Sequence, residues 1–366
     1  MPLSREQVET ALRSYIEPAL ATDLVTARAL KEIAIEDGSA GPRAAVSLEL
    51  GFPAERYGDE LARDLIAHLA KTTGAPLTAF EVRVAWRVTP HAVQKHLKPL
   101  PGVSNIIAVA SGKGGVGKST VAANLALALH QEGARVGVLD ADIYGPSQPR
   151  MLGISGRPVS KDGKHLQPML GHGLQCMSIG FLVDDDQPMV WRGPMVTQAL
   201  TQLLNDTEWQ DLDLLIVDMP PGTGDIQLTL SQRVPVAGAV IVTTPQDIAL
   251  LDARKGLQMF RKVDVTVLGV IENMGTHVCS KCGHEEAVFG AGGGERLAAQ
   301  YEAPFLGSLP LDASIREHAD SGAPTVVAAP DGAIAAAYRA IARKMAARLA
   351  QSQRDMTHKF PKIVVE

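Results

Sequence analysis

A glycine-rich loop with two lysines is the strongest chemical signal in this 366-residue chain. Residues 112–119 read G-K-G-G-V-G-K-S and match the phosphate-loop pattern G-x-x-x-x-G-K-[ST]. Backbone N–H groups of such a loop converge on phosphate oxygens at a helix N-terminus, where the helix dipole also favours anions. The pattern predicts that Lys118 reaches the β- and γ-phosphates and that the Ser119 hydroxyl binds Mg²⁺. The predicted nucleotide-binding residues of the loop are Gly112, Lys113, Gly114, Gly115, Val116, Gly117, Lys118, Ser119 and Thr120.

Aspartates follow two of the apolar stretches that we predict to be strands. Asp140 and Asp142 come after residues 136–139, and Asp218 comes after residues 214–217. Ligands bind at the carboxyl ends of the strands in open α/β sheets. We therefore predict that the three carboxylates lie near the phosphate loop, although capping a loop is the alternative role for any one of them.

Two of the three cysteines, Cys279 and Cys282, form a single C-x-x-C pair. Thiolates at this spacing can hold one metal ion or one edge of a cluster. A redox dithiol would need a thioredoxin-like context, and a zinc ribbon would need a second pair, which the chain lacks. Cys176 lies in an apolar segment and is expected in the core. So few cysteines exclude the disulfide framework of a secreted protein, and the pair is left with redox or metal chemistry.

The composition excludes several classes of protein. Apolar residues make up 46% of the chain and charged residues 20%, as in ordinary globular proteins. The net charge of −5 argues against a nucleic-acid partner, because no basic excess is present to neutralise phosphates. No apolar run approaches the ~18 residues of a membrane span, and residues 1–10 lack a signal pattern. We expect a cytoplasmic protein with no stable membrane association.

The elements that must position these residues fall into two groups. In the first, a helical apolar stripe over residues 8–16 precedes alternating apolar residues at 46–50 and 80–88, with a second helical stripe at 61–69 between them. This pattern predicts a small α+β domain over residues 1–90.

The second group follows a proline-rich stretch, residues 91–103, which is predicted to be a linker. Beyond it, short apolar runs alternate with longer helical segments, so residues 104–350 are predicted to be an α/β domain whose mostly parallel sheet is covered by helices on both faces. The strands are expected at residues 106–110, 136–139, 214–217, 239–242 and 267–271. The stripe at residues 334–349 predicts a core-packing helix with a solvated basic face that includes Arg343, and residues 351–366 are predicted to be a tail.

Several further motifs lie in the predicted α/β domain: V-L-D-A-D-I-Y-G at 138–145, W-R-G-P-M at 191–195, P-P-G-T-G-D at 220–225, E-N-M at 272–274, C-x-x-C-G-H at 279–284, F-G at 289–290 and G-G-G-E at 292–295. Through these motifs the chain resembles, over about residues 103–325, the Mrp/ApbC iron–sulfur carrier ATPases, which are deviant phosphate-loop NTPases of the MinD and ParA class. Residues 1–90 resemble the small α+β domain often fused in front of these ATPases. Some of those domains carry a cysteine where this chain has G-F-P-A-E at 51–55, so we expect a docking module there.

The resemblance implies roles for residues of the nucleotide site. Lys113, the extra lysine of the loop, would reach across a nucleotide-sandwich homodimer to the partner's ATP. Asp142 would orient the attacking water, Asp218 would hold Mg²⁺ through water, and Asn273 would contact the adenine. With Lys118, these residues imply ATP hydrolysis, expected to be slow.

The resemblance also implies that Cys279 and Cys282 hold an iron–sulfur cluster. A cluster usually takes four thiolates, so we predict a 4Fe–4S cluster that bridges two chains and passes to apo iron–sulfur proteins, with assembly factors as further partners. One alternative is a spatial-positioning ATPase, but residues 351–366 offer few large apolar residues for membrane cycling and that function leaves the cysteine pair unused. A zinc-stabilised scaffold switched by ATP is the other alternative.

Overall fold

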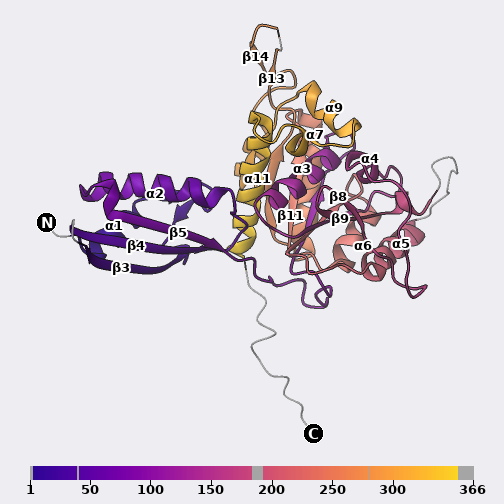
Figure 1. Cartoon of the computed structure of the whole chain (residues 1–366). Coiled ribbons are helices and arrows are strands. Elements are labelled where there is room, and N and C mark those ends of the chain that lie inside the picture. The colour runs from indigo at the N-terminus through magenta and orange to yellow at the C-terminus, as the bar shows by residue number, and fades with distance from the viewer. Residues whose placement is uncertain (1–2, 39–40, 184–192, 280, 353–366) are drawn as a thin grey trace.

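The computed structural model describes residues 3–38, 41–183, 193–279 and 281–352. Trp191 and Arg192, which begin one of the predicted motifs, and the predicted tail beyond Ser352 lie outside these residues. Figure 1 shows a small N-terminal region extending from a larger region that contains the remaining elements. Within the described residues, no helix combines the length and the apolar character that a membrane crossing requires.

The N-terminal region is a three-stranded sheet with helices on one side (Figure 1). Strand β4 (Gly41–Leu50) lies in the middle, antiparallel to β3 (Leu30–Gly38) and parallel to β5 (Phe80–Trp86). Alternate residues of β4 are buried beneath the helices, as the apolar alternation predicts. The other elements of this region are α1 (Arg5–Arg13), β1 (Ile16–Glu17), β2 (Thr22–Asp23), α2 (Tyr57–Thr73) and the short helix η1 (Leu77–Ala79).

The larger region is built on an eight-stranded sheet with the strand order β15-β12-β11-β6-β10-β7-β9-β8. Every neighbouring pair is parallel except the edge pair of β8 and β9. The five predicted strands form the centre of this sheet, with β15 on one side of them and β9 and β8 on the other. The strands are β6 (Ile106–Ala110), β7 (Val136–Asp140), β8 (Met169–Gly171), β9 (Leu174–Ser178), β10 (Leu214–Asp218), β11 (Gly238–Thr243), β12 (Val267–Glu272) and β15 (Phe305–Ser308).

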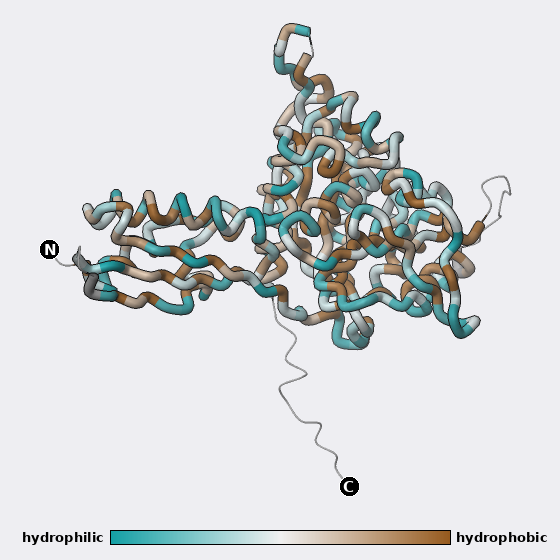
Figure 2. Tube along the Cα trace, in the orientation of Figure 1, coloured by the Kyte–Doolittle hydropathy of each residue, from teal (hydrophilic) through white to brown (hydrophobic). Residues whose placement is uncertain are grey.

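Helices cover both faces of this sheet, as predicted. Helix α3 packs with α4, α10 and α11, whereas α5 packs with α6 and α7 packs with α8. Figure 2 shows apolar segments concentrated in the strands that these helices enclose, and every residue of β6, β7 and β10 is buried. The helices are α3 (Lys118–Gln131), α4 (Gln148–Met151), η2 (Ile179–Phe181), α5 (Gly193–Asp206), α6 (Asp225–Arg233), α7 (Asp247–Lys262), α8 (Gly293–Gln300), α9 (Ala313–Asp320), α10 (Thr325–Ala328) and α11 (Ala333–Ala350).

One buried carboxylate joins the N-terminal region to the larger one. Glu132 follows helix α3 and is fully buried. One of its oxygens accepts hydrogen bonds from the backbone N–H groups of Arg56 (3.1 Å) and Tyr57 (3.0 Å) at the start of α2. The other accepts from the guanidinium of Arg343 on α11 at 3.0 Å. Three helices from distant parts of the chain therefore meet at one side chain.

The expectation of a solvated basic face on the last helix is wrong at Arg343. Its side chain is only 17% exposed, because it pairs with Glu132 and lies over the Tyr57 ring at 4.3 Å from the centroid.

The predicted linker is packed against the larger region, since the buried Gln94 donates a hydrogen bond to the Ser231 carbonyl at 2.9 Å. The N-terminal region is thus held by specific contacts, while the limits of the two domains stay a prediction.

Replacing Glu132 with glutamine is expected to lower the free energy of unfolding by about 3 kcal/mol. The amide keeps the size of the side chain but leaves Arg343 without its carboxylate, and breaking a buried pair is strongly destabilising. Denaturant unfolding measures the change. Glu9→Gln is the control, because the exposed pair of Glu9 with Arg13 is worth at most ~1 kcal/mol. Equal effects of the two variants would contradict this prediction.

Candidate functional site

The phosphate loop connects strand β6 to helix α3 at the carboxyl edge of the sheet, as predicted. Helix α3 begins at Lys118, and Gly117 before it has φ +80°, a left-handed conformation that favours glycine. The loop lines a cavity of about 240 Å³ together with Asp142, Ser147, Met151 and Pro221. The N-terminus of α3 therefore faces a space bordered by loop backbone and by polar side chains, which suits the binding of an anion.

Lys118 and Asp218 form a buried ion pair beside this cavity. The Lys118 ammonium donates to a carboxylate oxygen of Asp218, the last residue of β10, and also to the Ser119 hydroxyl at 3.2 Å. The two charged side chains are 6% and 0% exposed, respectively. A phosphate that approaches Lys118 therefore competes with Asp218 for the same ammonium. The structure brings together the residues expected to hold phosphate and Mg²⁺.

Gln148, at the start of α4, was not predicted from the sequence. Its side-chain amide is fully buried and donates to the Ser119 carbonyl and to the second carboxylate oxygen of Asp218, both at 3.0 Å. Gln148 thus fixes the orientation of Asp218 relative to the start of α3. Its only signal in the sequence is its position six residues after Asp142, in G-P-S-Q.

Asp140, the last residue of β7, organises the loop that carries Asp142. Its carboxylate accepts hydrogen bonds from the backbone N–H groups of Asp142, Ser147 and Gln148 and from the Ser178 hydroxyl, at distances of 2.9–3.2 Å. Burial, together with the nearby charge of Asp218, raises the pKa of Asp140 to about 7. Of the three predicted carboxylates, Asp140 therefore stabilises the loop that carries Asp142.

Asp142 and Lys113 both line the cavity and both are half-buried. Burial raises the pKa of Asp142, and the positive charge of Lys118 opposes that rise. The Lys113 carbonyl accepts a hydrogen bond from the Ser111 hydroxyl at 2.8 Å, which holds the backbone of the loop at this position. Their predicted catalytic roles require a nucleotide and stay predictions.

Asn273 supports the phosphate loop from the end of β12. Its side-chain amide, 7% exposed, donates to the Val116 carbonyl at 2.9 Å. A Cβ atom at Gly117 would overlap this amide, so the close approach requires glycine there. The predicted contact of Asn273 with adenine stays a prediction.

The cysteine pair lies apart from the cavity, on a hairpin formed by β13 (His277–Val278) and β14 (Glu285–Glu286) that projects from the larger region (Figure 1). Cys279 is half-buried and Cys282 is exposed. The Gly283 N–H donates to the Cys279 carbonyl at 2.8 Å, and the Cys279 N–H donates to the His284 carbonyl at 2.9 Å. These bonds form a tight turn that carries both cysteines.

The turn also favours the thiolate form of Cys279. Backbone N–H groups of Lys281 and Cys282, followed by the Cys282 side chain, hydrogen-bond to the Cys279 sulfur and lower its pKa. Cys176 differs in every respect, because it is fully buried in β9 and burial raises its pKa well above the usual value. The thiolate is the form that binds metals, so Cys279 and Cys282 are the cysteines suited to that role.

Comparisons with known proteins agree with both parts of this arrangement. Residues 102–346 match the family model of the NUBPL iron-transfer P-loop NTPase, and residues 5–82 match that of an iron-sulfur cluster assembly protein. The chain belongs to the family of NUBPL iron-transfer P-loop NTPases. A protein of Escherichia coli K12 named iron-sulfur cluster carrier protein is 51% identical over 350 residues, which cover 94% of this chain and 92% of the relative.

Further comparisons extend the similarity to a mouse protein and to two solved structures. The mouse iron-sulfur cluster transfer protein NUBPL is 52% identical over 257 residues, covering 70% of this chain and 81% of that protein. A nucleotide-binding protein of Archaeoglobus fulgidus, solved in complex with ADP, superposes with a TM-score of 0.54 at 38% identity and covers 60% of this chain and 87% of its own. The cell division ATPase MinD of Pyrococcus furiosus, at 22% identity and a TM-score of 0.50 over 66% of this chain and 98% of its own, shares the fold.

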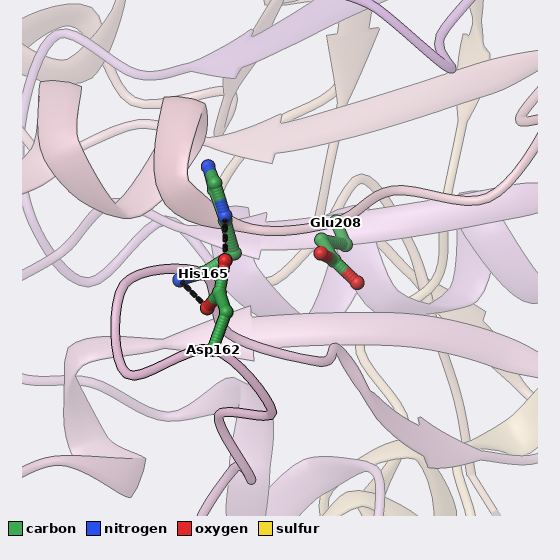
Figure 3. A group of neighbouring side chains, drawn as sticks. All are labelled: Asp162, His165 and Glu208. Carbon is green, nitrogen blue, oxygen red and sulfur yellow. Dashed lines mark hydrogen bonds and ion pairs between the residues drawn. The ribbon is translucent and has the colours of Figure 1, made fainter.

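The chain also has, among its described residues, a surface group of side chains of the kinds that bind metals, which sequence analysis did not single out. The ligand atoms of Asp162, His165 and Glu208 lie within 4.8 Å of one another (Figure 3). Asp162 is held within its own loop, because it accepts from the backbone N–H groups of Lys164 and His165 and lies 2.5 Å from the His165 ring. These bonds, led by that of the His165 backbone, hold the pKa of Asp162 below its usual range. The structure of this loop accounts for the approach of Asp162 and His165, and we assign the group no metal.

Proposed function

We propose that this chain is an ATP-dependent carrier that binds an iron–sulfur cluster at Cys279 and Cys282 and passes it to apo-proteins. The observation that carries the proposal is a C-x-x-C pair at the surface, with Cys282 exposed and Cys279 half-buried, on a hairpin that follows β12 and so leaves the sheet at the same edge as the phosphate loop after β6. The names of the relatives support it. An exposed pair suits a cargo that must leave again, whereas a resident redox centre is usually enclosed.

The cluster is the cargo of this carrier, and the number of thiolates predicts how it is held. Iron–sulfur clusters usually take four cysteine ligands, and each chain supplies two on its hairpin. We propose a homodimer whose two-fold axis passes between the hairpins, so that four thiolates hold one 4Fe–4S cluster. All three cysteines are free thiols, which fits action in the reducing cytoplasm.

The oxygen donors in and beside the cavity fit a magnesium nucleotide. The Ser119 hydroxyl and the Asp218 carboxylate are hard oxygen donors of the kind that Mg²⁺ prefers, and Lys118 offers its charge to the phosphates. Bound Mg²⁺ would neutralise charge that develops on the phosphates during transfer. Asp142, in the same cavity and with a raised pKa, would orient the attacking water.

The N-terminal region would serve as a docking module for assembly factors. Support comes from its match to an iron-sulfur cluster assembly protein over residues 5–82 and from its fixed attachment through Glu132. The proposed limits are residues 1–90 for the docking domain, 91–103 for the linker and 104–350 for the ATPase domain.

Replacing Lys113 with alanine is expected to leave ATP binding within a few-fold of wild type and to reduce hydrolysis by about 10³-fold, the lower end of the effect of an arginine finger. The lysine would contribute its charge to the partner's nucleotide in the transition state, and the variant retains Lys118 for binding. Steady-state hydrolysis and titration with an ATP analogue measure the two effects.

Mixing provides the control for action across the dimer. A mixture of the Lys113→Ala protein and the Lys118→Ala protein should regain part of the ATPase activity, because one of the two active sites in a mixed dimer contains both lysines. Normal ATP hydrolysis in Lys113→Ala alone would show that Lys113 is a solvated charge with no catalytic role.

Anaerobic reconstitution of the wild-type chain tests the proposed function. Incubation with iron and sulfide should yield a chromophore with visible absorption, and mixing with an apo-protein that needs a 4Fe–4S cluster should activate the acceptor. Parallel incubation with zinc addresses the alternative of a zinc-stabilised scaffold. Uptake of zinc without uptake of iron and sulfide would favour that scaffold and refute the carrier.

A further inference from the structure

The carboxyl end of strand β12 lies between the phosphate loop and the cysteine hairpin. Its last residue, Glu272, is 2% exposed although it is a carboxylate. The carboxylate accepts hydrogen bonds from the backbone N–H groups of Gly292 (3.2 Å) and Gly294 (2.6 Å) and from the Ser308 hydroxyl (3.4 Å). Gly292 is the N-cap of α8, so Glu272 fixes the segment by which the chain returns from the hairpin.

The neighbouring residue makes the equivalent contact on the nucleotide side. Asn273 donates to the Val116 carbonyl inside the phosphate loop, and this contact leaves no room for a side chain at Gly117. Two consecutive residues of one strand end therefore hold two functional segments. Glu272 holds the base of the hairpin and Asn273 holds the loop that leads into α3.

The packing around Glu272 leaves little freedom for independent movement. A Cβ atom at Gly294 would lie 2.9 Å from the Cβ of Glu272, so the two backbones are in close contact. The other leg of the hairpin is fixed as well, because the Leu311 N–H donates to the Thr276 carbonyl at 2.7 Å and the His277 ring lies 2.9 Å from the Leu311 carbonyl. A buried carboxylate is tolerated only when such donors satisfy it, so loss of this arrangement is energetically unfavourable.

We propose that Glu272 is a positioning residue that couples the phosphate loop to the cysteine hairpin, so that nucleotide binding and cluster binding influence each other. The inference rests on the proposed carrier function. A shift of the phosphate loop on nucleotide binding displaces Asn273, the adjacent Glu272 follows, and the hairpin base moves with it. Coupling between two ligands is reciprocal, so the cluster must change the affinity for nucleotide by the same factor as nucleotide changes the affinity for the cluster.

The experiment measures this factor. The full-length chain, with and without a reconstituted cluster, is titrated anaerobically with a non-hydrolysable ATP analogue at a protein concentration at which both forms run as dimers, so that dimerisation itself does not contribute, and the ratio of the two Kd values is the coupling factor. We expect the ratio to differ from one by about fivefold or more in the wild type. In Glu272→Gln it should lie near one, because the amide cannot accept from all three donors. Cluster content and cluster-free ATP hydrolysis should stay within about twofold of wild type, which is less than the smallest typical coupling factor of about fivefold.

Matched variants make the result specific. Glu302→Gln applies the same chemical change to an exposed glutamate just beyond α8 and should retain the wild-type ratio. Ser308→Ala removes one donor to Glu272 and should lower the ratio in part, which tests the proposal even if Glu272→Gln does not fold.

An unchanged ratio in Glu272→Gln would overturn the coupling, as would an unchanged ratio in Ser308→Ala where Glu272→Gln does not fold. Loss of the cluster from Glu272→Gln would also overturn it, because the carboxylate would then only stabilise the hairpin. A ratio of one in a wild-type chain that does load the cluster is the third contradicting outcome. Failure of the wild type to take up any cluster would instead refute the carrier function.

Discussion

Replacing Lys118 with alanine is expected to reduce ATP hydrolysis at least ~100-fold and to destabilise the protein by about 3 kcal/mol. The first effect follows from the loss of a charge-assisted contact with the phosphates in the transition state. The second follows from the buried ion pair, because the variant leaves Asp218, which is 0% exposed, without its partner. Steady-state kinetics and denaturant unfolding measure the two effects separately.

A double variant distinguishes the two roles of Lys118. Lys118→Ala with Asp218→Asn removes both buried charges, so it should recover much of the lost stability while hydrolysis stays at the level of the single variant. Lys255→Ala is the control for an exposed pair, since Lys255 is 59% exposed and lies 3.0 Å from Asp252. It should change stability by less than ~1 kcal/mol. Wild-type hydrolysis in Lys118→Ala would refute the assignment of the phosphate site.

The centre of the fold and the nucleotide loop were predictable because local signals determine them. Strands β6, β7 and β10 are continuous apolar runs, as expected for parallel strands buried on both faces. The loop pattern, together with a strand before it and a helix after it, located the N-terminus of α3. The short edge strands β8 and β15 carry no such signal, because their three and four residues are too few to show a period.

Residues that act through distant contacts could not be predicted. Gln148 meets Asp218 across 70 residues of sequence, and Glu272 meets Gly294 across 22. Arg343 was expected in solvent because it lies opposite the apolar stripe of the helix, and its burial is explained by Glu132, 211 residues away, together with the ring of Tyr57. The burial and role of such a side chain depend on a partner that is distant in sequence. The local sequence pattern carries no information about that partner.

Binding of the cluster should depend on Cys279 and Cys282, the two cysteines at the surface. Cys279→Ser and Cys282→Ser are each expected to lose nearly all of the iron and sulfide bound after anaerobic reconstitution, because each substitution removes two of the four thiolates available to a two-fold homodimer. Iron and sulfide analysis, with visible absorption, measures the loss. Delivery to an apo-acceptor should disappear with the cluster.

Cys176→Ala is the matched control, because it removes the third thiol from the core without placing a hydroxyl there. This variant should keep the cluster, at the expense of about 1 kcal/mol or somewhat more in stability for the lost packing. Loaded wild-type protein should contain about one 4Fe–4S cluster per two chains and should run as a dimer in size-exclusion chromatography under anaerobic conditions. A full cluster in each monomer, or loss of the cluster only in Cys176→Ala, would overturn the bridged arrangement, because the ligands would then have to come from a single chain.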